Sequence, residues 1–375
     1  MEKMLDTVVI GGGAMGSAAA WALSRRGRQV TVVEQFGPGH KIGASHGTTR
    51  NLNPGYHRPE YVAMLAEGLA LWDELEQESG ETLLARTGIV NHGPDPRLQD
   101  VAAALTQAGI QAKFLSPDEA GERWHGIRFD QQCLFMPDGG QLNPEAALPA
   151  FQRLAATRGA EIRHHTKVVE LKVMDDGVRL ALESEAGVEV VTAGQVVVTA
   201  GGWTGKLLRA AGAGLRIPAL RVTQEQPAHF RVADGDAVWP GFNHMPGATA
   251  EYRNWYSPVY GMQTPGEGIK AGWHGVGPLV DPDRRSFQPE PVQLAALQDY
   301  ARAWLPGVDA DSYEAISCTY TTTPDEDFIL DRIGPVVIGA GFSGHGFKFT
   351  PVVGRILADL ATGTRPAPEI FRASR

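Results

Sequence analysis

The N-terminal segment carries a glycine signature that constrains the fold more than any other feature. The apolar run 7–10 precedes Gly11, Gly13 and Gly16, which have the spacing Gly-x-Gly-x-x-Gly, and the small-residue segment 17–26 that follows is typical of a helix. A strand that turns through such a loop into a helix lets the backbone approach a pyrophosphate, whose charge then lies at the helix N-terminus. The sequence therefore predicts a βαβ dinucleotide-binding unit at the start of the chain.

An acidic residue ends the second strand of this unit. The strand 30–33 is followed by Glu34, at the offset from the last glycine where a carboxylate accepts the ribose hydroxyls of an adenosine. A carboxylate at this position disfavours a 2′-phosphate, so NADP is not expected. From the motif and its context, FAD and NAD both remain possible.

Length and composition limit the remaining choices. A chain of 375 residues with 43% hydrophobic and 21% charged residues is expected to form two compact domains that share an interface. The net charge of −9 argues against a nucleic-acid partner, because polyanion binding needs clustered Lys and Arg. Glu2, Lys3 and Asp6 interrupt any signal-like apolar stretch, and no window reaches membrane-spanning length, so a cytoplasmic protein is expected.

The pattern along the chain indicates that the nucleotide-binding domain is interrupted by a second domain. Helices are expected at 59–80, 98–108, 144–158, 291–304 and 350–361, with strands at 161–173, 178–191, 195–200 and 335–342 and a sheet-rich region at 217–322. The predicted fold combines α/β and α+β features. A Rossmann-like FAD-binding domain of the GR2 type comprises 1–85, 144–216 and 323–375, and a substrate domain built on a mixed β-sheet comprises 86–143 and 217–322.

Beyond the glycine signature, four segments carry a resemblance to a known family. They are 44–50 (Ala-Ser-His-Gly-Thr-Thr-Arg), 268–274 (Gly-Ile-Lys-Ala-Gly-Trp-His), 318–331, which begins at Cys318, and 341–348 (Gly-Phe-Ser-Gly-His-Gly-Phe-Lys). Through them the chain resembles the D-amino-acid-oxidase class of flavoproteins over nearly its whole length, and within that class the monomeric sarcosine oxidase and N-methyltryptophan oxidase group. The resemblance implies FAD as cofactor and a monomeric state.

The resemblance also implies how the flavin is attached. The matching cysteine of the family carries FAD as a thioether, and a thiolate can add to the 8α-methyl group of an oxidised flavin. Cys318 is therefore expected to hold a covalent FAD, whereas Cys133 lacks this context and is taken as a core residue. The implied cofactor-binding residues are Gly11, Gly13, Ala14, Met15, Gly16, Glu34, Gln35, Ser45, His46, Thr48, Thr49, Arg50, Val168, Ala200, Gly201, Trp203, Cys318, Gly344, Gly346 and Lys348.

Four residues are expected to act on the flavin or near the reacting bond. Lys270 matches the family lysine assigned to oxygen activation, where a fixed cation stabilises the superoxide that forms. His274, on the same face of the expected strand, resembles a residue that lines the substrate cavity. His46 and Arg50 resemble residues that lie against the flavin, where a cation raises the electron affinity of the ring.

The expected substrate site departs from the group at one position. Tyr260, His345 and Lys348 match substrate-site residues, but Asn53 replaces the arginine that pairs with the lysine to hold the substrate carboxylate. One point charge is not equivalent to a lysine and a bidentate fork. Either the carboxylate is bound less tightly, with help from Arg58, or the substrate is a secondary amine with a neutral polar tail.

The expected activity is oxidation of the C–N bond of a secondary or N-methylated amine or amino acid to an imine, with oxygen reduced to hydrogen peroxide. Alternatives are an oxidase or dehydrogenase that acts on a cyclic imino acid or a sugar-derived (fructosyl) amine, a nicotinamide-dependent reductase, and a non-catalytic nucleotide-binding module. No metal site is expected, because the pair His164-His165 falls in a predicted strand that would send the two side chains to opposite faces.

Overall fold

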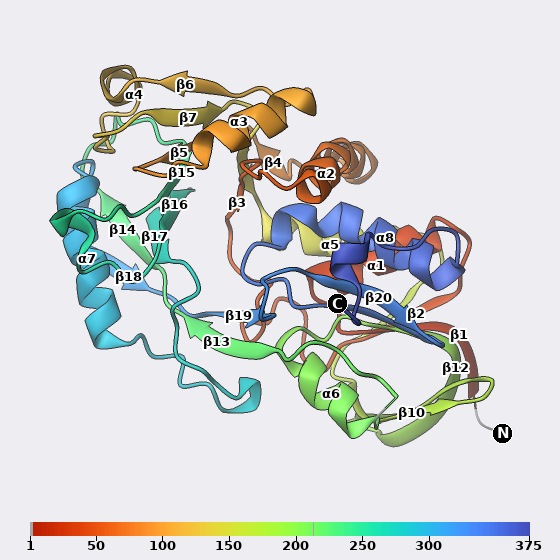
Figure 1. Cartoon of the computed structure of the whole chain (residues 1–375). Coiled ribbons are helices and arrows are strands. Elements are labelled where there is room, and N and C mark those ends of the chain that lie inside the picture. Colours follow the sequence, from red (N-terminus) through yellow and green to blue (C-terminus); the bar gives the residue numbers. More distant parts are fainter. Residues whose placement is uncertain (1–2, 213) are drawn as a thin grey trace.

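Two large β-sheets organise the chain (Figure 1). The computed structural model describes residues 3–212 and 214–375. Within these residues the strands form two eight-stranded sheets, a three-stranded sheet and a two-stranded ribbon. The helices are α1 (Ala14–Ser24), α2 (Pro59–Ser79), α3 (Leu98–Gln107), α4 (Pro117–Arg123), α5 (Pro144–Thr157), α6 (Thr204–Ala210), α7 (Pro291–Trp304) and α8 (Thr350–Thr362).

The first large sheet is built around the N-terminal strand. Its order is β10 (Lys167–Met174), β11 (Gly177–Ser184), β12 (Gly187–Val198), β1 (Lys3–Ile10), β2 (Val30–Val33) and β9 (Glu161–Arg163), with β21 (Val336–Ala340) beside β12 and β20 (Ile329–Ile333) beside β21. β1 runs parallel to both β2 and β12, with Ile10 opposite Val33 and Val198. The carboxyl ends of these parallel strands therefore meet at one edge, where ligands of such sheets bind.

Helices α1, α5 and α8 cover one face of this sheet (Figure 1). α1 is buried along its whole length, as expected of an alanine-rich helix without a polar face. Its contact with α8 is close, because a Cβ on Gly354 would lie 2.6 Å from the backbone of Ala18. Trp21, Trp72 and Phe151 fill the layer between the helices.

The second large sheet forms a separate core. Its order is β18 (Val308–Ala315), β14 (Ala228–Val232), β17 (Gly268–Trp273), β16 (Val259–Thr264), β15 (Gly241–His244), β5 (Ile89–His92), β7 (Cys133–Met136) and β6 (Lys113–Leu115). α7 packs against this sheet through Tyr300 and Trp304. β5 and β15 are parallel neighbours although they are far apart in the sequence, which places Asn91 beside Asn243.

Two smaller groups of strands lie between the large sheets (Figure 1). The ribbon pairs β13 (Arg221–Glu225) with β19 (Cys318–Thr322), and the small sheet joins β3 (Arg50–Leu52), β8 (Gly140–Leu142) and β4 (Leu84–Ala85). Cys318 therefore begins one connecting strand and Arg50 begins another. These connections bring residues from the two sheets to a common space.

Three local predictions differ from the structure. The strand expected at 195–200 is the second half of the continuous strand β12, which pairs with β11 along its first half and with β1 through most of its length. The strand β9 ends at Arg163, so His164 and His165 lie in a bend, and His165 has a φ of 52°. α4 was not expected, although Ser116 and Glu119 form a reciprocal capping box at its start.

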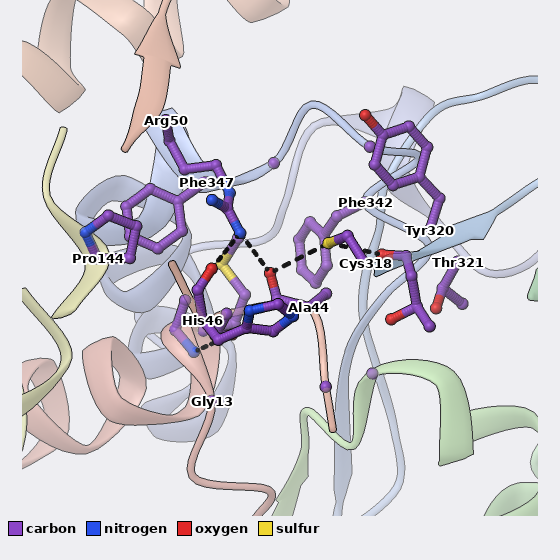
Figure 2. A pocket seen from close by; sticks show the side chains of 18 of the residues that line it. Gly13, Ala44, His46, Arg50, Pro144, Cys318, Tyr320, Thr321, Phe342 and Phe347 are labelled. Carbon is purple, nitrogen blue, oxygen red and sulfur yellow. Dashed lines mark hydrogen bonds between the residues drawn. The ribbon is translucent and has the colours of Figure 1, made fainter. Parts of the chain in front are cut away.

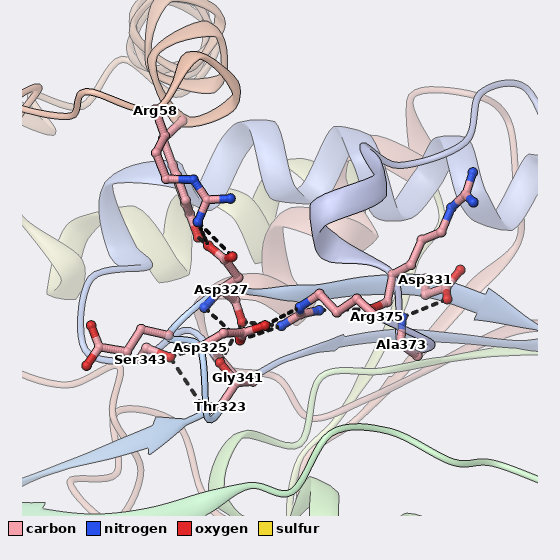
Figure 3. A network of polar contacts seen from close by, with 12 residues as sticks. Arg58, Thr323, Asp325, Asp327, Asp331, Gly341, Ser343, Ala373 and Arg375 are labelled. Carbon is pink, nitrogen blue, oxygen red and sulfur yellow. Dashed lines mark hydrogen bonds and ion pairs between the residues drawn. The ribbon is translucent and has the colours of Figure 1, made fainter.

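Polar contacts fix the segment that follows β19 (Figure 3). The Thr323 hydroxyl donates to the Asp327 carbonyl at 2.7 Å, and the Arg375 guanidinium donates to both oxygens of Asp325. The Arg375 bond lowers the pKa of the Asp325 carboxyl to about 2. The C-terminus thereby holds the turn between Cys318 and β20 in place.

Candidate active site

A cavity of about 1250 Å³ is lined by residues from all the segments that the sequence singled out. It extends from the N-terminal glycine loop, along the ends of β1, β2 and β12, to the face of the second sheet formed by β5, β15, β16 and β17. The predicted site residues that line it are Gly11, Gly13, Ala14, Met15, Glu34, Gln35, Ser45, His46, Thr49, Arg50, Asn53, Val168, Ala200, Gly201, Trp203, Tyr260, Lys270, His274, Cys318, Gly344, His345, Gly346 and Lys348.

Two of the predicted cofactor-binding residues, Gly16 and Thr48, do not line the cavity. Gly16 faces the loop behind it, and a Cβ at this position would lie 1.8 Å from the Gly11 carbonyl oxygen. It therefore allows the helix to pack closely on the strand, which is one of the functions of the glycine signature. The Thr48 hydroxyl donates to Glu267 at 2.8 Å, and Thr48 is absent from the lining residues.

The glycine loop has the geometry that the signature requires. Gly11 has a φ of +98°, and a Cβ there would lie 2.6 Å from the Thr199 carbonyl oxygen, so a larger residue would clash and be strained. The buried Glu34 carboxylate accepts the backbone N–H of Gly12 at 2.8 Å and that of Phe36 at 2.9 Å. These bonds hold the carboxylate at the end of β2 beside the loop.

The first turn of α1 opens onto the cavity. Gly13 caps this helix without a side-chain hydrogen bond, so the first N–H groups of the helix are available to a ligand apart from that of Ala14, which donates to the Ser45 hydroxyl at 3.0 Å. An uncapped helix N-terminus next to a close-approach loop is suited to a phosphate group.

Arg50 and His46 lie close together in the wall of the cavity (Figure 2). The Arg50 guanidinium donates to three backbone carbonyls, those of Thr49 at 2.8 Å, Ala44 at 3.1 Å and His46 at 2.5 Å. Burial and then the Arg50 charge lower the pKa of His46 to about 3, so this imidazole is neutral. Its Nε2 atom is buried and, among the described residues, has no hydrogen-bond partner.

Lys270 is buried on β17 and also faces the cavity. Its Nζ atom donates one long hydrogen bond, 3.4 Å, to the Thr49 carbonyl. Burial and then the Arg50 charge lower the pKa of Lys270 to about 7. In the part of the chain that the structure describes, neither Arg50 nor Lys270 forms an ion pair, so their charges are not neutralised by a carboxylate at contact distance.

Cys318 begins β19, which lies between the two large sheets (Figure 1), and its side chain points toward Ala44 (Figure 2). Its partly exposed thiol is free, with the Ala44 carbonyl at 4.0 Å and that of Thr319 at 3.8 Å from Sγ. By contrast, burial raises the pKa of the Cys133 thiol to about 12. Cys133 is absent from the cavity lining and belongs to a hydrophobic cluster, as an inert core cysteine does.

These features fit a bound FAD. The glycine loop, the open helix N-terminus and Glu34 provide for a pyrophosphate and a ribose, and the volume exceeds what an ordinary substrate needs. The orphaned Nε2 of His46 and the unneutralised charges of Arg50 and Lys270 face the space where a large polar ring system would supply acceptors. The residues present are therefore those that such a cofactor requires.

A second group of polar residues, centred on Lys348, lines another part of the same cavity. Lys348 donates to the Tyr56 hydroxyl at 3.0 Å and to the His345 carbonyl at 2.7 Å. Burial lowers the pKa of Lys348 to about 7, and burial together with Lys348 lowers the pKa of His274 to about 4. Burial also raises the pKa of Tyr260 above its usual range.

Asn53 takes part in a chain of amides that the sequence did not predict. Its Nδ2 atom donates to Asn91 Oδ1 at 3.2 Å, and Asn243 Nδ2 donates to the same oxygen at 3.0 Å. All three asparagines line the cavity. Asn91 and Asn243 are 152 residues apart, so only the pairing of β5 with β15 brings them together.

Arg58 does not occupy the place of the missing arginine. Its guanidinium donates to both oxygens of Asp327 at 2.8 Å, and it is absent from the cavity lining (Figure 3). The expectation that Arg58 helps to bind a substrate carboxylate is therefore not supported by its position, because an acid 269 residues away already engages it.

Across residues 3–212 and 214–375, no three His, Cys, Asp or Glu side chains gather so that they could hold a metal ion. Among the helices in the same residues, none has both the length and the apolar character that crossing a membrane requires.

Comparison with known proteins gives consistent matches over nearly the full length. The model of the DAO family, described as FAD dependent oxidoreductase, matches residues 6–360. The chain is 32% identical to monomeric sarcosine oxidase of Bacillus sp. (strain NS-129), covering 96% of this chain and 94% of the relative. It is also 32% identical to N-methyl-L-tryptophan oxidase of Salmonella newport (strain SL254), covering 99% and 98%.

A solved structure shows the same arrangement. The chain is similar to NikD, described as an unusual amino acid oxidase essential for nikkomycin biosynthesis, with a TM-score of 0.85 and 26% sequence identity. The match covers 99% of this chain and 98% of the other. The predicted mixed α/β fold is thereby confirmed.

Proposed function

The chain belongs to the DAO family of FAD-dependent oxidoreductases, and from this premise we propose that it oxidises the C–N bond of a secondary or N-methylated amine or amino acid to an imine, with oxygen as electron acceptor. When bound, FAD supplies the acceptor for a hydride equivalent and passes two electrons to oxygen, which gives hydrogen peroxide. The protein residues position the amine, exclude water and hold charge.

One observation carries the proposal. Lys270, Cys318 and Lys348 come from separate strands and a terminal helical turn, yet all three line one cavity. A nicotinamide reductase or a nucleotide-binding module needs neither a cysteine at the cavity nor a buried lysine beside it. The combination supports an oxidase in which one cation serves oxygen and another serves the substrate.

The cavity is suited to binding an amine in its neutral form. Burial keeps His274 neutral around pH 7, and its pKa of about 4 lets a ring nitrogen accept a hydrogen bond. Lys270 and Lys348 disfavour an additional ammonium nearby. An amine that binds unprotonated needs no side-chain base, so His274 and Tyr260 are proposed to orient the amine while His46 and Arg50 lie against the flavin.

Lys348 is proposed to bind the substrate carboxylate. It makes two hydrogen bonds and retains a third N–H, and within the described residues it has no acidic partner. A charge-assisted bond from a buried ammonium is stronger than a neutral one. Tyr56 and His345 are proposed to position the ammonium through the hydroxyl and the backbone carbonyl that it contacts.

Cys318 is proposed to hold the flavin as an 8α-S-cysteinyl thioether. A sulfur–carbon bond replaces the S–H bond of the thiol and a C–H bond of the 8α-methyl group, so two electrons and two protons are released. Oxygen, which the enzyme already uses, takes them as hydrogen peroxide. The Cys318 thiol is free and partly exposed and lines the cavity, which supports its contact with a ring bound there.

The domain division 1–85, 144–216 and 323–375 against 86–143 and 217–322 is proposed to separate cofactor binding from substrate binding. The first large sheet draws its strands from the first set and the second large sheet from the second, which supports the division. A monomer is proposed because relatives carry the name monomeric sarcosine oxidase. A cytoplasmic location stays a prediction.

A peroxide assay tests the proposed activity. The purified flavoprotein is supplied with sarcosine, other N-methyl amino acids, a cyclic imino acid and a fructosyl amino acid, and peroxide is measured along with anaerobic bleaching of the flavin. We expect bleaching and stoichiometric peroxide with at least one secondary amine. Bleaching without peroxide would indicate a dehydrogenase, and no bleaching with any amine would contradict the proposal.

A further inference from the structure

Three asparagines on neighbouring elements form one wall of the cavity. We call Asn53, Asn91 and Asn243 the asparagine wall. Asn91 lies on β5, Asn243 lies opposite it on β15, and Asn53 follows β3 directly. Asn91 is 3% exposed, so the amide at the centre of the wall is buried and faces the cavity.

The hydrogen bonds within the wall fix the orientation of its amides. Asn91 Oδ1 accepts from Asn53 and Asn243, which occupies both lone pairs of this oxygen. Asn53 Oδ1 accepts the Gly55 N–H at 2.9 Å. Since a flip of any amide would place donor against donor or break a bond, the polarity presented to the cavity is set.

The wall presents one unpaired donor group and one unpaired acceptor to the cavity. Within residues 3–212 and 214–375, the Nδ2 atom of Asn91 donates to no protein acceptor and the Oδ1 atom of Asn243 accepts from no protein donor. A carboxylate offers acceptors and would leave the Asn243 oxygen facing a lone pair. A ligand group that both donates and accepts would satisfy both atoms.

The wall also carries no charge. Its side chains contact one another and the Gly55 backbone, and in the described part of the chain none of them forms an ion pair. A charged group bound there would lose its hydration without a partner of opposite sign, which is unfavourable. The buried cation of the same cavity, Lys348, is held by Tyr56 and His345 and is proposed to pair with the substrate carboxylate, so it does not serve a second charged group at the wall.

We propose that the asparagine wall is a specificity site for a neutral hydrogen-bonding arm, a hydroxyl or carboxamide, of the secondary-amine substrate. This inference rests on the proposed function. The substrate class is then an N-alkylated amino acid whose carboxylate binds Lys348 and whose arm reaches Asn91 and Asn243. A carboxamide side chain and a polyol share this chemistry.

Binding of inert analogues tests the wall without turnover. In these compounds a thioether sulfur replaces the amine nitrogen. Three of them carry an arm of similar shape, which is a carboxamide, a carboxylate or an isobutyl group. A fourth compound carries a polyol as its arm. Dissociation constants are measured by calorimetry on the flavoprotein. We expect the carboxamide or the polyol to bind at least about fivefold tighter than the isobutyl analogue, and the carboxylate to bind weakest. Whichever of the carboxamide and polyol analogues binds more tightly indicates whether the substrate arm is a carboxamide side chain or a polyol.

Variants separate the wall from general effects on the cavity. Asn243→Leu should abolish the preference for the neutral polar arm, and Asn53→Leu should reduce it. Gln263→Leu removes an exposed amide from the adjacent strand β16, away from the main cavity, and should leave the preference unchanged. Thermal melting identifies a variant that does not fold, in which case the other wall variant decides.

The outcomes distinguish two failures. If sarcosine gives peroxide but the arms bind equally, or the carboxylate arm binds best, the asparagine wall is not a specificity site while the proposed function stands. If no secondary amine bleaches the flavin or gives peroxide, the proposed function fails and this inference fails with it.

Discussion

Two buried lysines in the same cavity differ in what holds them. Burial brings the pKa of both Lys270 and Lys348 to about 7, yet Lys348 has two short hydrogen bonds and Lys270 has one long contact with a carbonyl. Lys270 also lies near Arg50 and Cys318, whereas Lys348 lies among Tyr56, His274 and His345. Since residue type and burial are alike in the two lysines, we infer that their different surroundings give them different roles.

The largest expected effect follows from removing the loosely held lysine. Lys270→Met removes the cation proposed to stabilise reduced oxygen, so reoxidation of the flavin by oxygen should slow by about 10²–10³-fold. Anaerobic reduction by the amine should change far less. Stopped-flow measurement of the two half-reactions checks this, and slower reduction with unchanged reoxidation would show that Lys270 acts on the amine instead.

Replacement of Lys348, the lysine with two hydrogen bonds, should weaken substrate binding and leave reoxidation by oxygen unchanged. Lys348→Met deletes the charge-assisted hydrogen bond proposed to hold the substrate carboxylate, so the affinity for a carboxylate ligand should fall by about 10- to 100-fold. The rate of reoxidation by oxygen should stay close to that of the unmodified enzyme. A titration of flavin absorbance with an inert carboxylate analogue measures the affinity, and slower reoxidation in this variant would break the distinction between the lysines.

A pH series sharpens the comparison with a smaller effect. Each lysine is charged below its pKa of about 7, so each loses its charge as pH rises through 7. Above that point the second-order rate of reoxidation and the affinity for an inert carboxylate analogue without an amine should fall, approaching about tenfold per pH unit if the cation is essential. In Lys270→Met the reoxidation rate should lose this dependence on pH, and an unchanged profile would place the titrating group elsewhere.

Sequence patterns predicted the nucleotide-binding unit because its determinants are local. A strand, three glycines, a helix and Glu34 fall within one stretch of chain, and the structure has each of them. Lys270 and Cys318 were expected at the site through motif resemblance, and both line the cavity.

The asparagine wall and the engagement of Arg58 could not be predicted in the same way. They depend on side chains that only strand pairing and tertiary contacts bring together, such as Asn91 with Asn243 and Arg58 with Asp327. The continuity of β12 was missed because no local signal shows that this segment pairs with β11 and β1 as one strand. The helix α4 did have a local signal, the capping box of Ser116 and Glu119.

Attachment of the flavin to Cys318 is the central feature of the proposed enzyme. The most direct test is acid precipitation of the purified protein, followed by visible absorbance of the pellet and the supernatant. We predict that the yellow colour stays with the pellet in the unmodified protein and in Cys133→Ser, and moves to the supernatant in Cys318→Ser. Release of all flavin from the unmodified protein, or its retention by Cys318→Ser, would contradict the account.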